Sequence, residues 1–405
     1  MYYATSNYQK AIKEDVRTVK MDCKISLTNG ITYNFVDKEI LRGSLYINKR
    51  CVSKDDLELG CLYASEMGIS IKYSGNAYNF QDAIISPKFS LYIEEISQYE
   101  SIPLGNFKVS GVERKNNYVQ LTAMDDILKF DKTVPTSEYS YNEHYDKPYS
   151  IGKHLGNFII WCCEKCDVPT KLKVANFDSY PGNAMHGIDV EYKDLSNITY
   201  RDFLSSSLQL LGLFGYIDTQ GYFCVRSFDT DYRKVFTPRD RYSLSSNDYE
   251  VCSIGFSYEG VYSGINTYSV ELSNNLFLEQ MEYNQTNSPI IGSILNKIFS
   301  SKNNYQTLSY VPCTMEYPGD PTIDVGDMIR IEPIMPSLNQ KFKIYRDLNG
   351  HKGSELNGLI FGQKSDYGIT PFNALVMEHN WVYRGKCTIR SFGKNIILRK
   401  IYRKK

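Results

Sequence analysis

A short pattern occurs twice in this chain, and it constrains the fold more than any other feature of the sequence. Residues 57–60 read LELG and residues 323–326 read IDVG. Each glycine is followed by a short alternating run, ISI at 69–71 and MIRI at 328–331. Alternation with a period of two is typical of a strand that is buried on one face. The pattern therefore predicts two similar β modules, one near each end of the chain.

A strand–turn–strand pattern follows each of these glycines. The first runs through residues 106–123 with its turn at 116–117, and the second runs through 374–390 with its turn at 384–385. Two similar modules per chain would let three copies present a ring of six similar units, able to meet a six-fold partner on one side and a three-fold partner on the other. Short alternating patterns also recur by chance in a Tyr- and Gly-rich β protein, so the sequence alone leaves both interpretations open.

The fold class expected is α+β, mainly β, with two tube-like β-barrel modules and an inserted α/β domain. The first module spans 17–135, where short strands alternate with turns. Its clearest local signal is Asn29-Gly30 between two alternating runs, which predicts a β-hairpin.

Residues 136–228 favour an α/β insert. Ser150 can cap a helix whose apolar positions recur at helical spacing. Thr199 with Asp202 predicts a capping box that opens a second helix, ending at Gly215. A hairpin over 216–225 follows. The apolar face of the first helix comprises Ile151, Leu155, Phe158, Ile159, Cys162 and Cys166.

The remaining segments complete the expected organisation. Residues 1–16 are polar and aperiodic, and are predicted to form an arm. The charged, turn-rich range 229–248 is predicted to be a linker. The second module is expected over 249–395, with an inserted helix at about 288–301. The basic tail 396–405 is either a solvated end or a contact for DNA phosphates or an acidic neighbour.

Composition excludes several classes of protein. The formal net charge of the 405-residue chain is zero, so no global field draws it to nucleic acid or to an acidic membrane. No stretch approaches the about 18–20 apolar residues of a membrane span, and the N-terminus lacks a secretory signal. We therefore expect folding in a cytoplasm, with reduced cysteines packed in the core. The 34 tyrosines suit half-buried strands and protein interfaces.

Motifs that carry chemistry are weak in this sequence. Cys163 and Cys166 have the spacing of a redox pair or half a zinc site, but no other CxxC or HxxxH supplies further ligands. The position of Cys162 and Cys166 on an apolar helix face favours core packing. The histidines share no metal-binding or catalytic motif, and they are His144, His154, His186, His351 and His379.

Carboxylate pairs are the remaining candidates. Asp125 and Asp126 are adjacent and would point to opposite faces of a strand, so a strand end or a helix cap is favoured. The other two pairs are Asp229 with Asp231, in the predicted linker, and Asp320 with Asp324, on either side of Pro321. We therefore predict no catalytic, cofactor-binding or metal-binding residue and no enzyme. Hydrolases with dispersed carboxylates leave no local signature.

An ordered series of segments resembles one family, the baseplate hub or tail-associated proteins at the tip of bacteriophage tails and related contractile particles. Together the segments cover roughly residues 17–390. They are 43–47 (GSLYI), 57–60 (LELG), 102–109 (IPLGNFKV), 121–132 (LTAMDDILKFDK), 198–204 (ITYRDFL), 212–221 (GLFGYIDTQG) and 319–327 (GDPTIDVGD).

The resemblance implies a structural homotrimer in the virion tail, assembled in the host cytoplasm. Such a ring joins a hexameric tail tube or distal tail protein to a trimeric spike or fibre. It surrounds the channel that carries DNA or the tape-measure protein. Many family members continue into a lytic domain, whereas this sequence ends at Lys405. Two alternatives stay open: a cell-wall-degrading tail lysin with dispersed catalytic carboxylates, and a carbohydrate- or receptor-binding tail protein.

Overall fold

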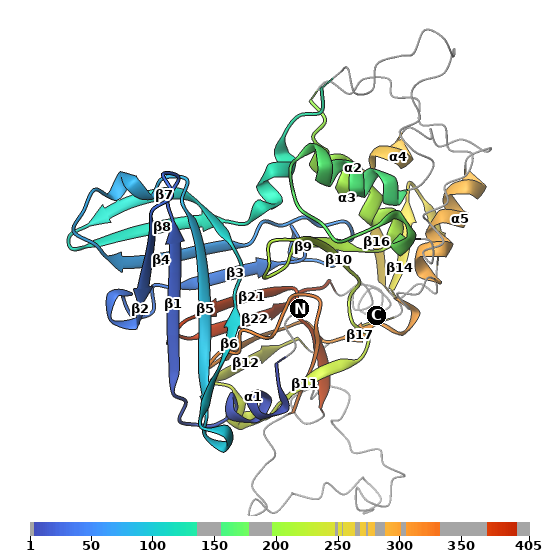
Figure 1. The fold of residues 1–405 in the computed structure, drawn as a ribbon. Helices are drawn as coiled ribbons and strands as arrows, with labels where there is room; N and C mark the ends of the chain where they lie inside the picture. The colour runs from blue at the N-terminus through green and yellow to red at the C-terminus, as the bar shows by residue number, and fades with distance from the viewer. Residues whose placement is uncertain are drawn as a thin grey trace, which may run out of the picture.

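The computed structural model describes residues 4–135, 155–177, 197–247, 250–252, 254–263, 268–272, 274–279, 288–300, 305–332 and 371–394. The chain is mainly β with some helices, which confirms the expected fold class at that level. A large antiparallel sheet forms one side of the molecule, and most of the helices gather on the other (Figure 1).

The large sheet has twelve strands, drawn from both the N-terminal and the C-terminal parts of the chain. Its order is β12-β18-β22-β21-β3-β4-β8-β7-β5-β1-β2, with β6 paired to β5. The strands are β1 (Val19–Ser26), β2 (Thr32–Val36), β3 (Tyr46–Arg50), β4 (Glu66–Lys72), β5 (Ile84–Ile93), β6 (Gln98–Pro103), β7 (Phe107–Lys115), β8 (Tyr118–Met124), β12 (Ser243–Ser246), β18 (Cys313–Tyr317), β21 (Glu378–Val382) and β22 (Cys387–Ser391).

The predicted pair of barrels is replaced, among the described residues, by this one open sheet. Strand β21 of the second module pairs with β3 of the first, so the sheet runs from one module into the other. Its two ends are β2 and β12. The hairpins predicted from the sequence are confirmed as β1–β2, β7–β8 and β21–β22.

The two faces of the large sheet differ in chemistry, because successive side chains of a strand point to opposite faces. Matched registers carry the alternation across the β3–β21 pair without interruption. The apolar face contains Met21, Cys23, Ile25, Ile47, Ile69, Phe89, Leu91, Val109, Leu121, Met315, Trp381 and Ile389. The polar face contains Lys20, Asp22, Lys24, Asn48, Arg50, Glu66, Ser86, Lys88, Gln120, Thr122, Ser243, Glu316, Glu378, Asn380, Thr388 and Arg390.

Smaller sheets lie beside the large one. Two of them have two strands each: β9 (Phe214–Ile217) with β10 (Phe223–Arg226), and β13 (Val251–Cys252) with β17 (Ser309–Tyr310). One three-stranded sheet contains β11 (Tyr232–Phe236), β19 (Met328–Ile331) and β20 (Phe372–Leu375). The other contains β14 (Ile254–Tyr258), β15 (Val261–Ser263) and β16 (Tyr268–Glu271). The β9–β10 hairpin confirms the one predicted at 216–225.

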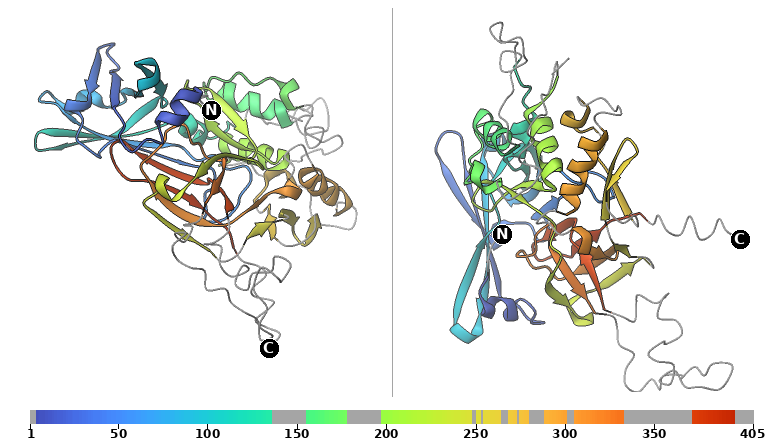
Figure 2. Two further views of the ribbon diagram at one scale, coloured as in Figure 1. Left: turned by 90° about the horizontal axis from the view of Figure 1, so that it is seen from below. Right: turned by 90° about the vertical axis from the view of Figure 1, so that its right-hand side faces the viewer.

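The helices pack together with one of the small sheets. Helix α5 contacts β14, β15 and α3, whereas α2 packs against α3. The range 254–299, predicted within the second module, therefore belongs to the helical part of the molecule (Figure 2). The helices are α1 (Ser6–Ala11), α2 (Leu155–Lys165), α3 (Tyr200–Leu211), α4 (Leu276–Glu279) and α5 (Ser288–Phe299).

Local signals locate these helices well. Thr199 caps α3 and forms the predicted capping box with Asp202. The helix ends at Leu211 rather than at Gly215, because Gly212 adopts a left-handed conformation with φ +70° that terminates it. The apolar face of α2 is buried as predicted, whereas Ser150 and Ile151 lie outside the described residues.

Three expectations need correction. The predicted linker 229–248 contains β11 and β12, which pair with β19 and β18. The predicted arm 1–16 contains α1, whose Tyr8 is fully buried. The run 374–379 is divided between β20 and β21, which lie in different sheets. The basic tail 396–405 lies outside the described residues.

Candidate functional site

Both motif glycines lie against the segment formed by α3 and β9. Gly60 and Gly326 have φ values of +74° and +85°, a region that favours glycine. A methyl group on Gly60 would lie 2.4 Å from the backbone oxygen of Ser205 in α3. A methyl group on Gly326 would lie 2.6 Å from the ring of Phe214 in β9. The repeated motif therefore brings each β module into close contact with the same part of the insert.

Hydrogen bonds and an ion pair hold the insert to the first module. The amide of Gly60 donates to the carbonyl oxygen of Leu213 at 2.8 Å. Arg201, in the first turn of α3, donates from Nη2 to Asp131 at 2.9 Å and also contacts the carbonyl oxygen of Leu62. These contacts fix the N-terminal end of α3 and the start of β9 on the first module.

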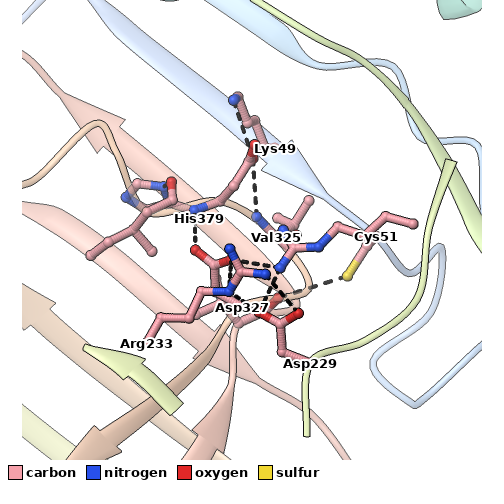
Figure 3. A network of polar contacts seen from close by, with 11 residues as sticks. Lys49, Cys51, Asp229, Arg233, Val325, Asp327 and His379 are labelled. Atoms are coloured by element: carbon pink, nitrogen blue, oxygen red, sulfur yellow. Dashed lines mark hydrogen bonds and ion pairs between the residues drawn. The ribbon is translucent and has the colours of Figure 1, made fainter. Parts of the chain in front are cut away.

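Arg226 holds the insert to the second module. From β10 it reaches Asp327 and Asp229, each at 2.7 Å, and donates to the carbonyl oxygen of Val325 at 3.0 Å. Its side chain is only 12% exposed and that of Asp327 only 5%. Arg233 also contacts Asp229, so two guanidinium groups share the two carboxylates (Figure 3). Buried charges are stable only when they are paired in this way.

Asp324 links the same network to the first module. Its carboxylate pairs with Lys49 of β3 at 3.2 Å, and its amide donates to Asp327 at 2.8 Å. Burial raises the pKa of Asp324, but Lys49 and Arg226 outweigh this effect, and the resulting pKa lies below the usual value. Asp324 therefore remains charged and bridges the two modules at the point where the insert docks.

The direct β3–β21 contact completes this junction. The amide of Cys51 donates to the carbonyl oxygen of Met377 at 3.0 Å, and Arg50 faces Glu378 across the strands with an N–O distance of 3.6 Å. Tyr383 donates to Asp37 at 2.6 Å. First module, second module and insert thus meet in one set of buried contacts, which we call the three-way junction.

His379 lies in the three-way junction, and it is the one histidine among the residues that the structure describes. It is 3% exposed, its Nδ1 hydrogen is donated to the carbonyl oxygen of Ile323 at 3.1 Å, and Tyr317 donates to its Nε2 at 2.7 Å. Burial, followed by the nearby Lys49, lowers its pKa to about 4. The other four histidines lie outside the described residues.

We expect His379 to make stability depend on pH. The unfolded chain binds a proton near pH 6.5 and the folded chain only near 4, so stability falls as the pH drops through this window, by up to about 3 kcal/mol. Asp125 acts in the opposite direction, because burial raises its pKa to about 6. Urea unfolding of His379→Gln and Asp125→Asn between pH 4 and 7 measures both effects. On acidification His379→Gln should lose less stability than wild type, and Asp125→Asn should lose more. If stability falls with pH equally in all three proteins, these two groups do not cause the pH dependence.

The other sequence candidates have structural roles. Cys163 and Cys166 are 1% and 6% exposed, and burial raises the pKa of both thiols. Asp125 caps a short 3-10 helix by accepting from the amide of Ile127, as the helix-cap interpretation predicts. Asp320 pairs with Lys234, so it and Asp324 are engaged with different lysines.

Metal-type side-chain clusters and membrane-spanning helices are two kinds of feature that would indicate a further role for the described part of the chain. There, no three His, Cys, Asp or Glu side chains form a cluster suited to a metal ion. Nor is any helix among those residues long and apolar enough to cross a membrane. What the site offers is a set of permanent contacts that hold three parts of one chain together.

Sequence reasoning missed the basic members of the three-way junction. Lys49, Arg226 and Arg233 belong to no motif. Lys49 and Arg226 reach Asp324 and Asp327 through the tertiary fold, whereas Asp229 is three and four residues from its arginines in the sequence. One signal was present, since Arg226 ends an otherwise apolar strand and the second glycine motif is flanked by Asp324 and Asp327. Opposite charges embedded in apolar runs indicate buried pairs.

Comparison with solved structures finds similar chains, two of which are described below. No family model matches the chain, and no curated protein matches it. The crystal structure of the 43 kDa tail protein of prophage MuSo2 from Shewanella oneidensis is 10% identical, covers 93% of this chain and 98% of its own, and has a TM-score of 0.47. A chain of the native gene transfer agent virion is also 10% identical, covers 32% of this chain and 48% of its own, and has a TM-score of 0.23.

Proposed function

We propose that this chain is a structural baseplate hub protein of a phage tail or phage-tail-like particle. In this proposal three copies form a pseudo-six-fold ring that joins a hexameric tail tube, or distal tail protein, to a trimeric spike or fibre. The observation that carries the proposal is the continuous sheet formed by the two β modules through β3 and β21. The ordered family resemblance supports it.

The three-way junction suits a part that must be stiff. Paired strands, buried ion pairs and close glycine contacts leave the modules little freedom to move relative to each other. A ring built from such chains keeps its shape when force passes from a tail tube to a spike. The first module would comprise residues 17–135, and the second would comprise β11 and β12 together with the described ranges 305–332 and 371–394.

The polar face of the large sheet suits the wall of a channel. Opposite charges are neighbours on it, as in Asp22 with Lys88 at 3.9 Å and Glu378 with Arg390 at 3.4 Å. Such a surface has no large field of one sign, so neither DNA nor a tape-measure protein would be held strongly in passing. The open edges β2 and β12 are available for contacts between copies, because exposed edges pair readily with other strands.

The mass of the native assembly tests this proposal. The protein at micromolar concentration should have three times the 46.6 kDa mass of one chain, by native mass spectrometry and by light scattering. Trimers with interfaces of the obligate class should persist on dilution. A protein that stays monomeric at all concentrations and in the presence of its tail-tube partner would contradict the proposal.

A further inference from the structure

A cleft of about 500 Å³ lies where the segment before β1 crosses the boundary between the two modules. One wall is formed by residues 15–19, and the opposite walls by the loop 318–319 and by the end of β21 at 381–384. Small-ligand sites typically have volumes of about 300–1,000 Å³ and often lie between domains. Neither the motif glycines nor Arg226 line this cleft.

Three arginines line the cleft, and their partners leave positive charge unmatched. Arg17 donates to the carbonyl oxygens of Gly319 and Ile12 at 2.9 and 3.3 Å, which are neutral acceptors. Arg384 pairs with Asp37 at 3.1 Å. Arg42 is exposed and makes no hydrogen bond or ion pair with the described residues. Asp15 is the single carboxylate among the lining residues, against three arginines, so the site has an excess of positive charge.

The aromatic floor of the cleft is rigid. Phe89, Trp381 and Tyr383 are each at most 5% exposed, and Phe89 packs edge-on against both other rings with centroid distances of 5.7 and 6.3 Å. The Arg384 guanidinium stacks over the Tyr383 ring at 5.2 Å. Phe89 lies in β5, Trp381 in β21 and Tyr383 directly after β21, so the floor has a fixed shape before any ligand arrives.

We propose that this cleft binds a small polyanion through Arg17, Arg42 and Arg384. Guanidinium groups recognise phosphate and carboxylate groups by paired hydrogen bonds to two oxygens, so a polyphosphate and a polycarboxylate both suit the site. Arg17 precedes β1, Arg42 lies in the first module, and Arg384 follows β21. A bound polyanion thus connects the N-terminal segment to both modules and stabilises their arrangement.

Calorimetric titration of the full chain at low ionic strength tests the proposal, with pyrophosphate as the phosphate probe and citrate as the carboxylate probe. Arg42→Gln should weaken binding at least about tenfold, the effect of losing one charge-assisted contact. Asp15→Asn should tighten binding, because it removes the opposing carboxylate. Lys24→Gln removes the same charge from the exposed polar face of the sheet and should leave the affinity unchanged.

The outcomes separate the alternatives. Binding of one probe only, with the Arg42 effect, identifies the oxyanion that the cleft prefers; equal binding of both identifies a site for either. Absence of millimolar binding by both probes overturns the proposal. So does an Arg42→Gln affinity equal to that of Lys24→Gln, which would reveal general charge attraction. None of these results depends on whether the chain forms trimers.

Discussion

Replacing Gly60 with alanine is expected to lower the free energy of unfolding by about 3 kcal/mol, the sum of left-handed backbone strain and overpacking. The added methyl group would lie 2.4 Å from the Ser205 carbonyl oxygen, which is part of α3 and cannot rotate away. Either α3 shifts or the first module does. The loss should be visible as a lower urea midpoint with an unchanged slope.

Two other glycines provide the matched controls. Gly30 and Gly43 have φ values of +85° and +71°, but a methyl group on either would meet no atom within 4 Å. Alanine at these positions should therefore cost only the strain, about 1 kcal/mol. If Gly60→Ala is no more destabilising than Gly43→Ala, the close contact with α3 does not support the junction.

Arg226→Met is expected to destabilise the chain by about 3–5 kcal/mol, because it removes the close charged partner of the buried Asp327. Asp327 is 5% exposed and would keep the hydrogen bond from the Asp324 amide, but its nearest described cation would be Arg233 at 3.8 Å. Adding Asp327→Asn should restore part of the loss, since the second change removes the unpaired charge. Urea unfolding of the two single variants and the double variant measures the coupling.

An exposed pair is the control for this cycle. Lys115 and Glu113 lie 3.1 Å apart with side chains 57% and 63% exposed. Lys115→Met should change stability by less than about 1 kcal/mol. If Arg226→Met behaves like Lys115→Met, the buried network does not hold the insert to the second module.

Local features of this fold were predictable from the sequence. The Asn29-Gly30 turn, the Thr199 capping box and the apolar face of α2 each depend on residues close together in the chain. Turn and cap chemistry acts over a few residues, so short patterns are sufficient to reveal it. The two glycine motifs were also visible, although the sequence did not show that Gly60 lies against α3 and Gly326 against β9.

Long-range pairing was not predictable in the same way. Strand β11 lies in a charged, turn-rich range, yet it pairs in parallel with β19, which begins nearly a hundred residues later. The β3–β21 pair joins segments from opposite ends of the chain. Strand pairing of this kind depends on which edges the rest of the fold leaves open, and no local pattern encodes it.

The most direct test of the central claim is the symmetry of the native assembly in averaged projection images. The account predicts end-on views with three-fold symmetry in which six similar densities surround an open channel, two from each chain. Views that show a single copy or a two-fold assembly would contradict it. So would a three-fold ring in which the two densities from each chain differ clearly from each other.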